Sequence, residues 1–401
     1  MSDTRKMIDL DANATTPMDP RVLEAMRPHL LAGGNPESRH ALGRQARRAW
    51  DDARERIAAM LGAHVDELVL TSGGTESNNA AINGLWRKFG PNCSGRGAGR
   101  VLSSAIEHPA VAEPLEMMQR NGLITLQSLP VGRDGVCNVA DFRQAIEEGP
   151  KPAFLTLMLA NNETGAIQPV VELAEICAGL GIAFHTDAVQ AVGRIDVDFK
   201  RLGVTTLAAG SHKMHGPPGI GILLVKKGLT LEPLIIGGGQ QKGRRAGTPP
   251  VALAVGLAEA LSLFNREKTT RHENWHDLRQ LLMCELQLYL SQTSIRVELN
   301  GPEDAEKRLP QTLSIWFDHP GYVGELALMK LDMAGVAASL GSACASGSMR
   351  PSPVLLAMGL GEERAKGSIR VSFPANATGD EVKQAAKIMA DIVIDLTSDT
   401  D

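Results

Sequence analysis

The sequence lacks the features that mark several large classes of protein. No apolar run approaches the roughly 20 residues that a membrane-spanning helix needs. The stretch from Met1 to Leu10 has no signal-peptide core, so we expect a cytoplasmic protein without a membrane partner. The formal net charge of −5 gives no electrostatic reason to expect direct binding of nucleic acid. Internal repeats and low-complexity tracts are also absent.

Cysteine is scarce, and its spacing excludes the common cysteine-based scaffolds. The five cysteines are Cys93, Cys137, Cys177, Cys284 and Cys344. They are odd in number and scattered, with no CxxC pair, and the chain contains no HExxH motif. We therefore expect neither a disulfide framework nor a metal site. One of the five is a candidate for a reactive thiol, and the others are expected to fill the core.

What is present is the composition of a folded globular protein. The chain has 401 residues, of which 43% are hydrophobic and 22% charged, so it is long enough for two domains. We place a large domain at residues 18–262 and a smaller one at residues 1–17 and 263–401. A helix over residues 251–290 is expected to bridge them. The segments beyond it alternate irregularly between strands and helices, which is typical of an α+β domain.

Two strand-like runs end in polar residues that together indicate a cofactor site. Asp187 follows one run and Lys213 follows the other, 26 residues later. This spacing fits one strand–helix–strand crossover, which places both side chains at the same carboxyl edge of a parallel sheet. The amine can form a Schiff base with the aldehyde of pyridoxal 5′-phosphate (PLP), and the carboxylate can keep the pyridine nitrogen protonated. The alternative is a surface lysine and a helix-capping aspartate.

Other strand ends carry groups that suit the same cofactor. Residues 71–79 form a glycine turn with hydroxyl groups before a helix, which can bind a phosphate or cap an ordinary helix. His108 precedes Pro109 at a predicted helix start, where it can stack on an aromatic ring or act as a cap. Residues 161–165 place further polar groups at the edge of the sheet.

Two loops are rich in small residues. Residues 237–248 are basic and glycine-rich, and they form either a mobile surface loop or a second phosphate contact through Thr248. Residues 337–348 surround Cys344 with small side chains that have little to pack against, so we expect a mobile loop. Because a cysteine in such a loop is exposed, a nucleophile is favoured over a core residue.

In their order along the chain, these motifs resemble the NifS/IscS-type cysteine desulfurases of the class V aminotransferase family. The resemblance extends from residues 11–16 (Asp-Ala-Asn-Ala-Thr-Thr) to residues 368–372 (Ser-Ile-Arg-Val-Ser). It implies the α/β architecture of PLP fold type I. The large domain would hold a mostly parallel seven-stranded sheet, and the smaller α+β C-terminal domain would carry the mobile cysteine loop at about residues 338–350.

The resemblance also implies roles for individual residues. Lys213 would form the Schiff base, Asp187 would pair with the pyridine nitrogen, His108 would stack on the ring as a catalytic residue, and Cys344 would take the sulfur. The other implied contacts fall into three groups. The phosphate would be bound by Gly74, Thr75, Ser211 and His212, with Thr248 from the partner of a homodimer. Gln190 and Asn162 would contact the ring hydroxyl region. Asn162 and Arg370 would bind the substrate, with Arg370 gripping its carboxylate in a bidentate fork.

The implied reaction converts L-cysteine to L-alanine with a persulfide on Cys344. This sulfur would supply iron–sulfur cluster assembly or other thiolation, through a scaffold protein, a tRNA-thiolation relay or free thiols. Three alternatives stay open from the sequence: a related PLP-dependent lyase or aminotransferase in which Cys344 is incidental, a selenocysteine lyase, and a non-catalytic dimeric partner in sulfur assembly.

The chain departs from the family pattern at three places. Residues 210–211 read Gly-Ser where Ser-Gly is usual, which moves one phosphate hydroxyl. Residues 240–242 read Gln-Gln-Lys in place of His-Glu-Arg. Residues 349–350 read Met-Arg in place of Leu-Glu. We hypothesise that Arg350, a cation six residues from Cys344, favours the thiolate of Cys344 or alters docking of the sulfur acceptor.

Overall fold

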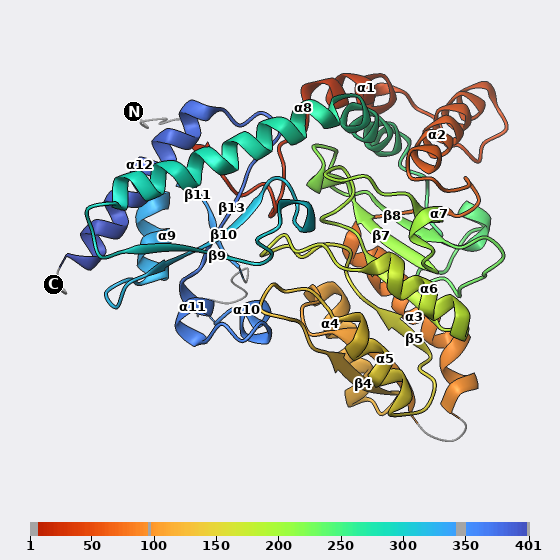
Figure 1. The fold of residues 1–401 in the computed structure, drawn as a ribbon. Helices are drawn as coiled ribbons and strands as arrows, with labels where there is room; N and C mark the ends of the chain where they lie inside the picture. The colour runs from red at the N-terminus through yellow and green to blue at the C-terminus, as the bar shows by residue number, and fades with distance from the viewer. Residues whose placement is uncertain (1–6, 95–97, 342–349, 399–401) are drawn as a thin grey trace.

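The computed structural model describes residues 7–94, 98–341 and 350–398, and it has two lobes joined by one long helix (Figure 1). The larger lobe contains a seven-stranded sheet with helices packed on it. The smaller lobe contains a four-stranded sheet and a two-stranded ribbon, and both ends of the described chain belong to it. The α/β fold with a large sheet and a smaller α+β lobe confirms the predicted fold class.

The elements follow one another in a mostly alternating order of helix and strand. The larger lobe contains α1 (Pro20–Leu31), α2 (Ala41–Met60), β2 (Leu68–Thr71), α3 (Gly74–Ser94), β3 (Gly99–Ser104), α4 (Pro109–Arg120), β4 (Ile124–Leu129), α5 (Val139–Glu147), β5 (Phe154–Thr156), α6 (Val170–Leu180), β6 (Ala183–Asp187), α7 (Phe199–Leu202), β7 (Thr206–Gly210), the 3-10 helix η1 (Ser211–Lys213), β8 (Gly221–Val225) and the 3-10 helix η2 (Gln240–Gly243). After α8 (Val251–Leu290), the smaller lobe contains β9 (Arg296–Asn300), the 3-10 helix η3 (Ala305–Lys307), β10 (Thr312–Asp318), α9 (Gly324–Met333), β11 (Val336–Ala337), β12 (Ser339–Leu340), α10 (Pro353–Ala357), α11 (Glu362–Gly367), β13 (Ile369–Ser372) and α12 (Gly379–Thr397). β1 (Ile8–Asp9) joins this lobe by pairing with β11.

The larger sheet has the strand order β2-β8-β7-β6-β5-β3-β4. β4, β3, β5, β6 and β7 are parallel, and β8 is antiparallel to both of its neighbours. Every residue of β6, β7 and β8 is buried, as expected for strands covered by helices on both faces. Because parallel neighbours end at the same edge, Asp187 at the end of β6 and η1 directly after β7 are brought together.

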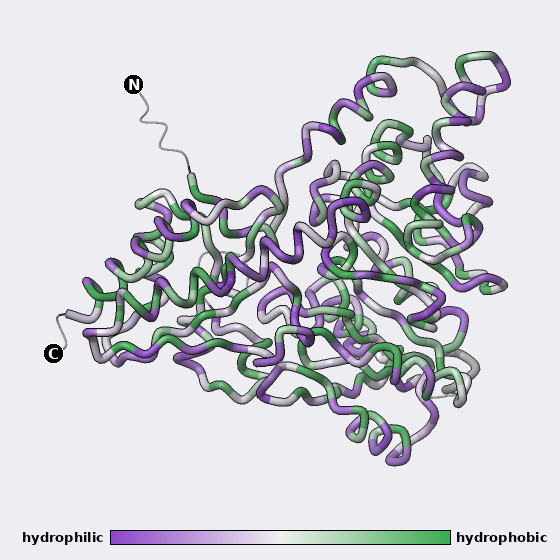
Figure 2. The backbone as a smooth tube through the Cα atoms, turned by 45° about the horizontal axis from the view of Figure 1, so that its top comes forward, coloured by the Kyte–Doolittle hydropathy of each residue, from purple (hydrophilic) through white to green (hydrophobic). Residues whose placement is uncertain are grey.

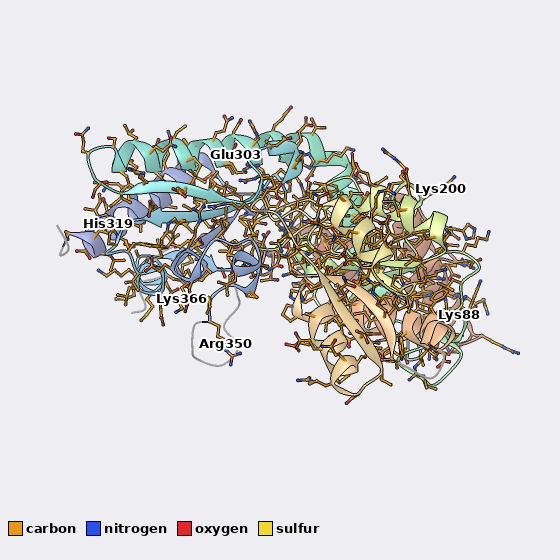
Figure 3. All side chains as sticks on the ribbon, turned by 60° about the horizontal axis from the view of Figure 1, so that its bottom comes forward. Lys88, Lys200, Glu303, His319, Arg350 and Lys366 are labelled. Carbon is orange, nitrogen blue, oxygen red and sulfur yellow. The ribbon has the colours of Figure 1, made fainter. Side chains whose placement is uncertain are left out.

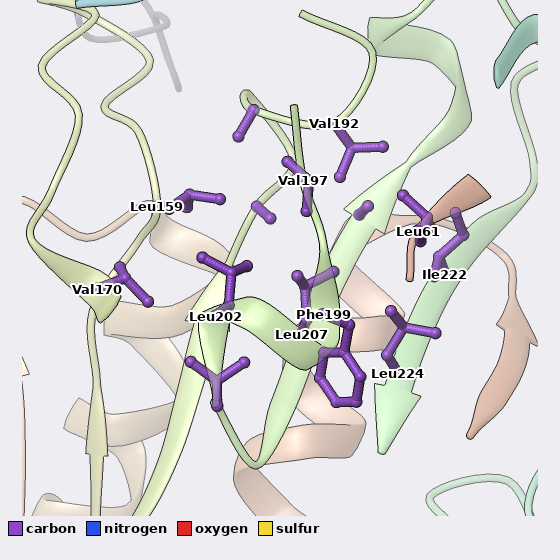
Figure 4. Packing of buried hydrophobic residues seen from close by; sticks show 14 of the residues in the cluster. Leu61, Leu159, Val170, Val192, Val197, Phe199, Leu202, Leu207, Ile222 and Leu224 are labelled. Carbon is purple, nitrogen blue, oxygen red and sulfur yellow. The ribbon is translucent and has the colours of Figure 1, made fainter. Parts of the chain in front are cut away.

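The core of the larger lobe lies between this sheet and its covering helices. Figure 4 shows Leu207 of β7 and Ile222 and Leu224 of β8 packed with Phe199 of α7 and with Leu61. Hydrophobic and hydrophilic residues alternate along the helices, as amphipathic packing requires (Figure 2). A rigid core of this kind holds the polar ends of the strands in fixed positions.

α8 connects the two cores. Its first half contributes Ala254, Leu257 and Leu261 to the core of the larger lobe, and its second half contributes Trp275 and Leu282 to that of the smaller lobe. The predicted helix over residues 251–290 is confirmed. The predicted domain boundary between residues 262 and 263 falls inside this helix, close to the point where its buried residues pass from one core to the other.

The smaller lobe's main sheet has the antiparallel order β12-β13-β10-β9. The segment after β1 leaves this lobe and lies between β13 and η1. The Ala12 amide donates to the Ser372 carbonyl, and the Thr16 amide donates to the His212 carbonyl. This segment therefore links the smaller lobe directly to the turn that carries Lys213.

Where the chain is described, no helix is both long and apolar enough to cross a lipid bilayer.

The glycine turn before α3 depends on a close backbone contact with Gly221. A Cβ atom on Gly221 would lie 2.5 to 2.7 Å from the backbone C, Cα and O atoms of Gly73. Gly210, directly opposite on β7, has more room, because a Cβ atom there would meet nothing closer than 3.5 Å. We expect Gly221→Ala to lower the free energy of unfolding by about 1–3 kcal/mol through overpacking.

The matched control for this prediction is Gly210→Ala, which should cost less because its Cβ atom would make ordinary van der Waals contacts. Thermal or denaturant unfolding of both variants measures the difference. Equal stability losses in the two variants would contradict the close packing of β8 against the glycine turn.

Candidate active site

A cavity of about 250 Å³ lies at the carboxyl edge of the larger sheet. Most of the predicted site residues line it. They are Gly74, Thr75, His108, Asn162, Asp187, Gln190, His212 and Lys213. The wall also includes five residues that the sequence did not single out: Asn78, Ala110, Met158, Ala160 and Val189. The residues come from five separate stretches of the chain, and the sheet topology brings them to one edge.

Lys213 ends η1, and its amine points towards the N-terminal segment. The Nζ atom donates to the carbonyl oxygens of Asn13 at 2.5 Å and Ala14 at 2.7 Å. Burial, followed by the positive charges of Arg194 and Arg370, lowers the pKa of Lys213 to about 7. A substantial fraction of the amine is therefore neutral near pH 7, as a lysine nucleophile or base requires.

Asp187 is a buried carboxylate at the end of β6. Its Oδ1 accepts from the Val189 amide at 2.9 Å, and its Oδ2 accepts from the Asn78 side chain at 2.7 Å. Burial raises the pKa of Asp187, so its ionised form gains from a cation inside the cavity. A protonated ring nitrogen would supply such a charge.

Behind Asp187 lies a chain of hydrogen bonds that the sequence reasoning missed. Burial lowers the pKa of His185 to about 3, so its ring is neutral. The Asn78 amide nitrogen is used by Asp187, so its oxygen accepts from Nε2 of His185 at 2.9 Å. The Nδ1 atom of His185 then accepts from the hydroxyl of Thr206, also at 2.9 Å. The spacing gave a usable signal, because Asn78 lies one helical turn after Gly74 on α3.

His108 caps a helix and lines the cavity, and its stacking on a cofactor ring stays a prediction. It is the N-cap of α4, where its Nδ1 accepts from the Ala110 amide at 3.1 Å. It also lines the cavity, and burial lowers its pKa. The cap hydrogen bond holds the ring at the cavity wall, where it could stack on a flat cofactor.

At the predicted phosphate end, Gly74 begins the 21-residue helix α3, so free N–H groups and the positive end of the helix dipole are directed at the cavity. His212 lies beside it, and burial lowers its pKa to about 4. Ser211 is not brought into the cavity. Its buried hydroxyl has no hydrogen-bond partner among the described residues, and it lies so close to Gly216 that a Cβ atom there would be 2.2 Å away.

The basic loop over residues 237–248 is anchored to the larger lobe. The Gln241 side chain pairs with the amide and carbonyl of Leu70 on edge strand β2, both at 2.8 Å. Arg245 forms an ion pair of 3.0 Å with Glu76 in the first turn of α3. Thr248 is exposed and does not line the cavity, so its contact with a phosphate in the partner subunit stays a prediction.

Arg370 of β13 lies near the cavity but is not one of the residues that line it. Its Nη2 pairs with Asp11 at 2.7 Å, and its Nη1 donates to the Asn162 carbonyl at 3.3 Å. Its Nε is buried without a partner in the described part of the chain. The guanidinium therefore keeps a free donor beside Asn162.

Cys344 lies outside the described residues, so its predicted role is not tested. The segments before and after residues 342–349 both contact Glu163, the neighbour of Asn162 in the sequence. Glu163 accepts from the Ser352 hydroxyl at 2.5 Å, and a Cβ atom on Gly341 would lie 2.0 Å from the same carboxylate oxygen. Arg350 is exposed on the lower edge of the smaller lobe in Figure 3.

Comparisons with known proteins identify the family of this chain. Residues 8–385 match the family described as aminotransferase class-V. The protein named cysteine desulfurase IscS from Dictyoglomus turgidum is 39% identical over 391 residues, which cover 97% of this chain and 95% of that protein. A solved NifS-like protein superimposes with a TM-score of 0.84 at 31% identity, covering 96% of this chain and 99% of that one. SspA, solved in complex with cysteine, superimposes with a TM-score of 0.77 at 31% identity, covering 93% and 100%. The chain belongs to the class-V aminotransferase family.

Proposed function

We propose that this protein is a PLP-dependent cysteine desulfurase that converts L-cysteine to L-alanine and takes the sulfur as a persulfide on Cys344. The observation that carries the proposal is that the Lys213 amine and the buried Asp187 carboxylate line one cavity, which the start of α3 also lines. The similar proteins support the substrate class, since one is named a cysteine desulfurase and another was solved with cysteine.

The cavity offers a partner for each part of PLP. The start of α3, with Gly74 and Thr75, and the neutral His212 suit the phosphate. Asp187 suits a protonated ring nitrogen, and His108 suits the ring face. When bound, PLP supplies an electron sink for the charge that develops at the substrate α-carbon.

Lys213 then moves the proton. With its pKa lowered to about 7, the Nζ atom can take the α-proton of the substrate near neutral pH and return it. The carbonyl oxygens of Asn13 and Ala14 hold the amine at the cavity edge between these transfers. A lysine with an ordinary pKa would be protonated and unable to act as a base.

Arg370 and Asn162 are placed to bind the substrate carboxylate. The unpaired Nε of Arg370 is a buried donor, and such groups are costly unless a partner arrives. A carboxylate that bonds this nitrogen would place the substrate amine and α-carbon towards Lys213. We propose that the Asp11 contact of Arg370 holds the guanidinium in place when no substrate is bound.

The sulfur transfer falls to Cys344. Its thiolate attacks the sulfur of the substrate, a new S–S bond forms, and the bond between the substrate sulfur and its β-carbon breaks. The electron pair of the broken bond goes to the β-carbon, which takes a proton to become the methyl group of alanine. The persulfide then passes to an acceptor, for which an iron–sulfur scaffold protein is the proposed partner. We further propose a cytoplasmic homodimer in which the exposed Thr248 reaches the phosphate bound by the partner subunit.

Replacing Cys344 tests the reaction. We expect Cys344→Ala to lose alanine and persulfide formation down to the background rate, while PLP uptake stays normal. Cys284→Ala is the matched control, because Cys284 is exposed on α8 and should be dispensable. Alanine release is followed by chromatography, and the persulfide is located by mass spectrometry. Full alanine production by Cys344→Ala would indicate lyase or aminotransferase chemistry instead.

Replacing Asn78 tests the role of Asp187. Asn78→Ala removes a hydrogen bond to a buried carboxylate, and such bonds contribute about 1.5–3 kcal/mol. We therefore expect PLP affinity to fall by roughly 10- to 100-fold. Asn83→Ala is the control on the same helix, because its side chain donates only to the helix backbone. Equal PLP affinities of the two variants, measured by equilibrium dialysis, would show that the hydrogen bond from Asn78 to Asp187 does not support cofactor binding.

A further inference from the structure

Arg194 is a buried cation held entirely by neutral groups. Its side chain is 2% exposed. The two Nη atoms donate to Asn13 Oδ1 at 2.6 Å, to the carbonyl oxygens of Ala12 at 2.8 Å and Lys213 at 3.2 Å, and to Gln190 Oε1. When the amide oxygen of Gln311 faces the guanidinium, it accepts from Nη1 at 2.9 Å and Nε at 3.3 Å.

These contacts provide an acceptor for each of the five guanidinium N–H groups. None of the acceptors is a carboxylate, and in the described part of the chain no acidic side chain forms an ion pair with Arg194. A buried arginine is usually paired with an acid. Here the buried positive charge has no carboxylate to neutralise it, and burying an unneutralised charge is unfavourable.

The same contacts connect three separate parts of the active site. Gln190 and Lys213 both line the cavity, and both donate to the carbonyl oxygen of Asn13, at 3.1 Å from Gln190 Nε2 and 2.5 Å from Lys213 Nζ. Arg194 bonds all three of these residues. It therefore ties the N-terminal segment, the turn after β6 and the turn after β7 into one unit around the lysine amine.

We propose that Arg194 is a positioning residue of this site: its guanidinium fixes Asn13, Gln190 and the Lys213 backbone, and it places a positive charge without a neutralising carboxylate next to the residue that carries the reactive amine. The proposal rests on the proposed function only in taking Lys213 as the reactive amine. Replacing the arginine by lysine would keep the charge but lose the planar five-donor fork.

Several charged groups around the Lys213 amine influence its pKa. After burial itself, Arg194 is the largest influence that lowers the pKa of Lys213, and Arg370 adds to it. Asp11 and Asp187 act in the opposite direction, and His212 is neutral near pH 7. Removing the Arg194 charge should therefore raise the pKa of Lys213. The amine would then become protonated, and so unreactive, at a higher pH than in the wild type.

The test uses protein from which PLP has been removed, so that the readout does not depend on turnover. Lys213 acetylation by acetic anhydride is measured as a function of pH, with the modified peptide quantified by mass spectrometry. We expect the midpoint of Arg194→Met to move up by about one pH unit, which makes the amine about tenfold less reactive below the midpoint. Arg194→Lys should keep the wild-type midpoint but bind PLP several-fold more weakly.

Arg308→Lys is the matched control. Arg308 is also buried and also donates to backbone carbonyls, but its acceptors, Asn300 and Pro302, do not line the cavity, whereas two acceptors of Arg194 do. This variant should leave both the midpoint and the PLP affinity unchanged. Circular dichroism establishes whether each variant is folded. If Arg194→Met does not fold, the PLP affinity of Arg194→Lys still tests the positioning role.

Three results would overturn the proposal. The charge role is refuted if Arg194→Met keeps the wild-type midpoint, or if Arg194→Lys shifts the midpoint as far as Arg194→Met does. The positioning role is refuted if Arg194→Lys binds PLP as tightly as Arg308→Lys does. A failure of the proposed function is distinguishable from these results, because wild-type protein would then bind no PLP or release no alanine whatever the acetylation midpoint.

Discussion

A buried carboxylate and a half-buried amine, placed at the ends of two neighbouring parallel strands, line one cavity, and the site depends on this pair. β6 delivers Asp187 and β7 delivers Lys213 to one cavity. Burial acts on both groups in the same sense, because it disfavours the charged form of each. The aspartate is thereby prepared for a cationic partner, and the lysine is prepared to act as a neutral amine. One environment thus prepares two groups for complementary tasks.

The surrounding structure fixes this pair from three directions. The series of hydrogen bonds from Thr206 through His185 and Asn78 orients Asp187 from the side of α3. The N-terminal segment holds the Lys213 amine and is itself held by Arg194. The packing of α8 into both cores joins the lobes, so the smaller lobe's Arg370 stays beside Asn162. The side chains that support the reactive groups, those of Asn13, Asn78, His185 and Arg194, are all buried.

The sequence predicted the reactive and binding residues that line the cavity better than the residues that support them. Strand ends with glycine turns and polar residues are local patterns, so Asp187, Lys213, His108 and Gly74 could be found from the order of the chain alone. Arg194 and His185 gave no such signal, since a buried arginine or histidine looks like any other until its distant partners are placed. Ser211 shows the converse, because its neighbour in sequence, His212, lines the cavity while its own hydroxyl faces Gly216.

The most direct measurement of the central claim is the location of covalently fixed PLP. Protein loaded with PLP is reduced with sodium borohydride, digested, and mapped by mass spectrometry. We expect the reduced adduct on the peptide that contains Lys213, and we expect Asp187→Ala to weaken the loading without moving the adduct. An adduct on any other lysine, or none at all, would contradict the assignment of this cavity as the catalytic centre.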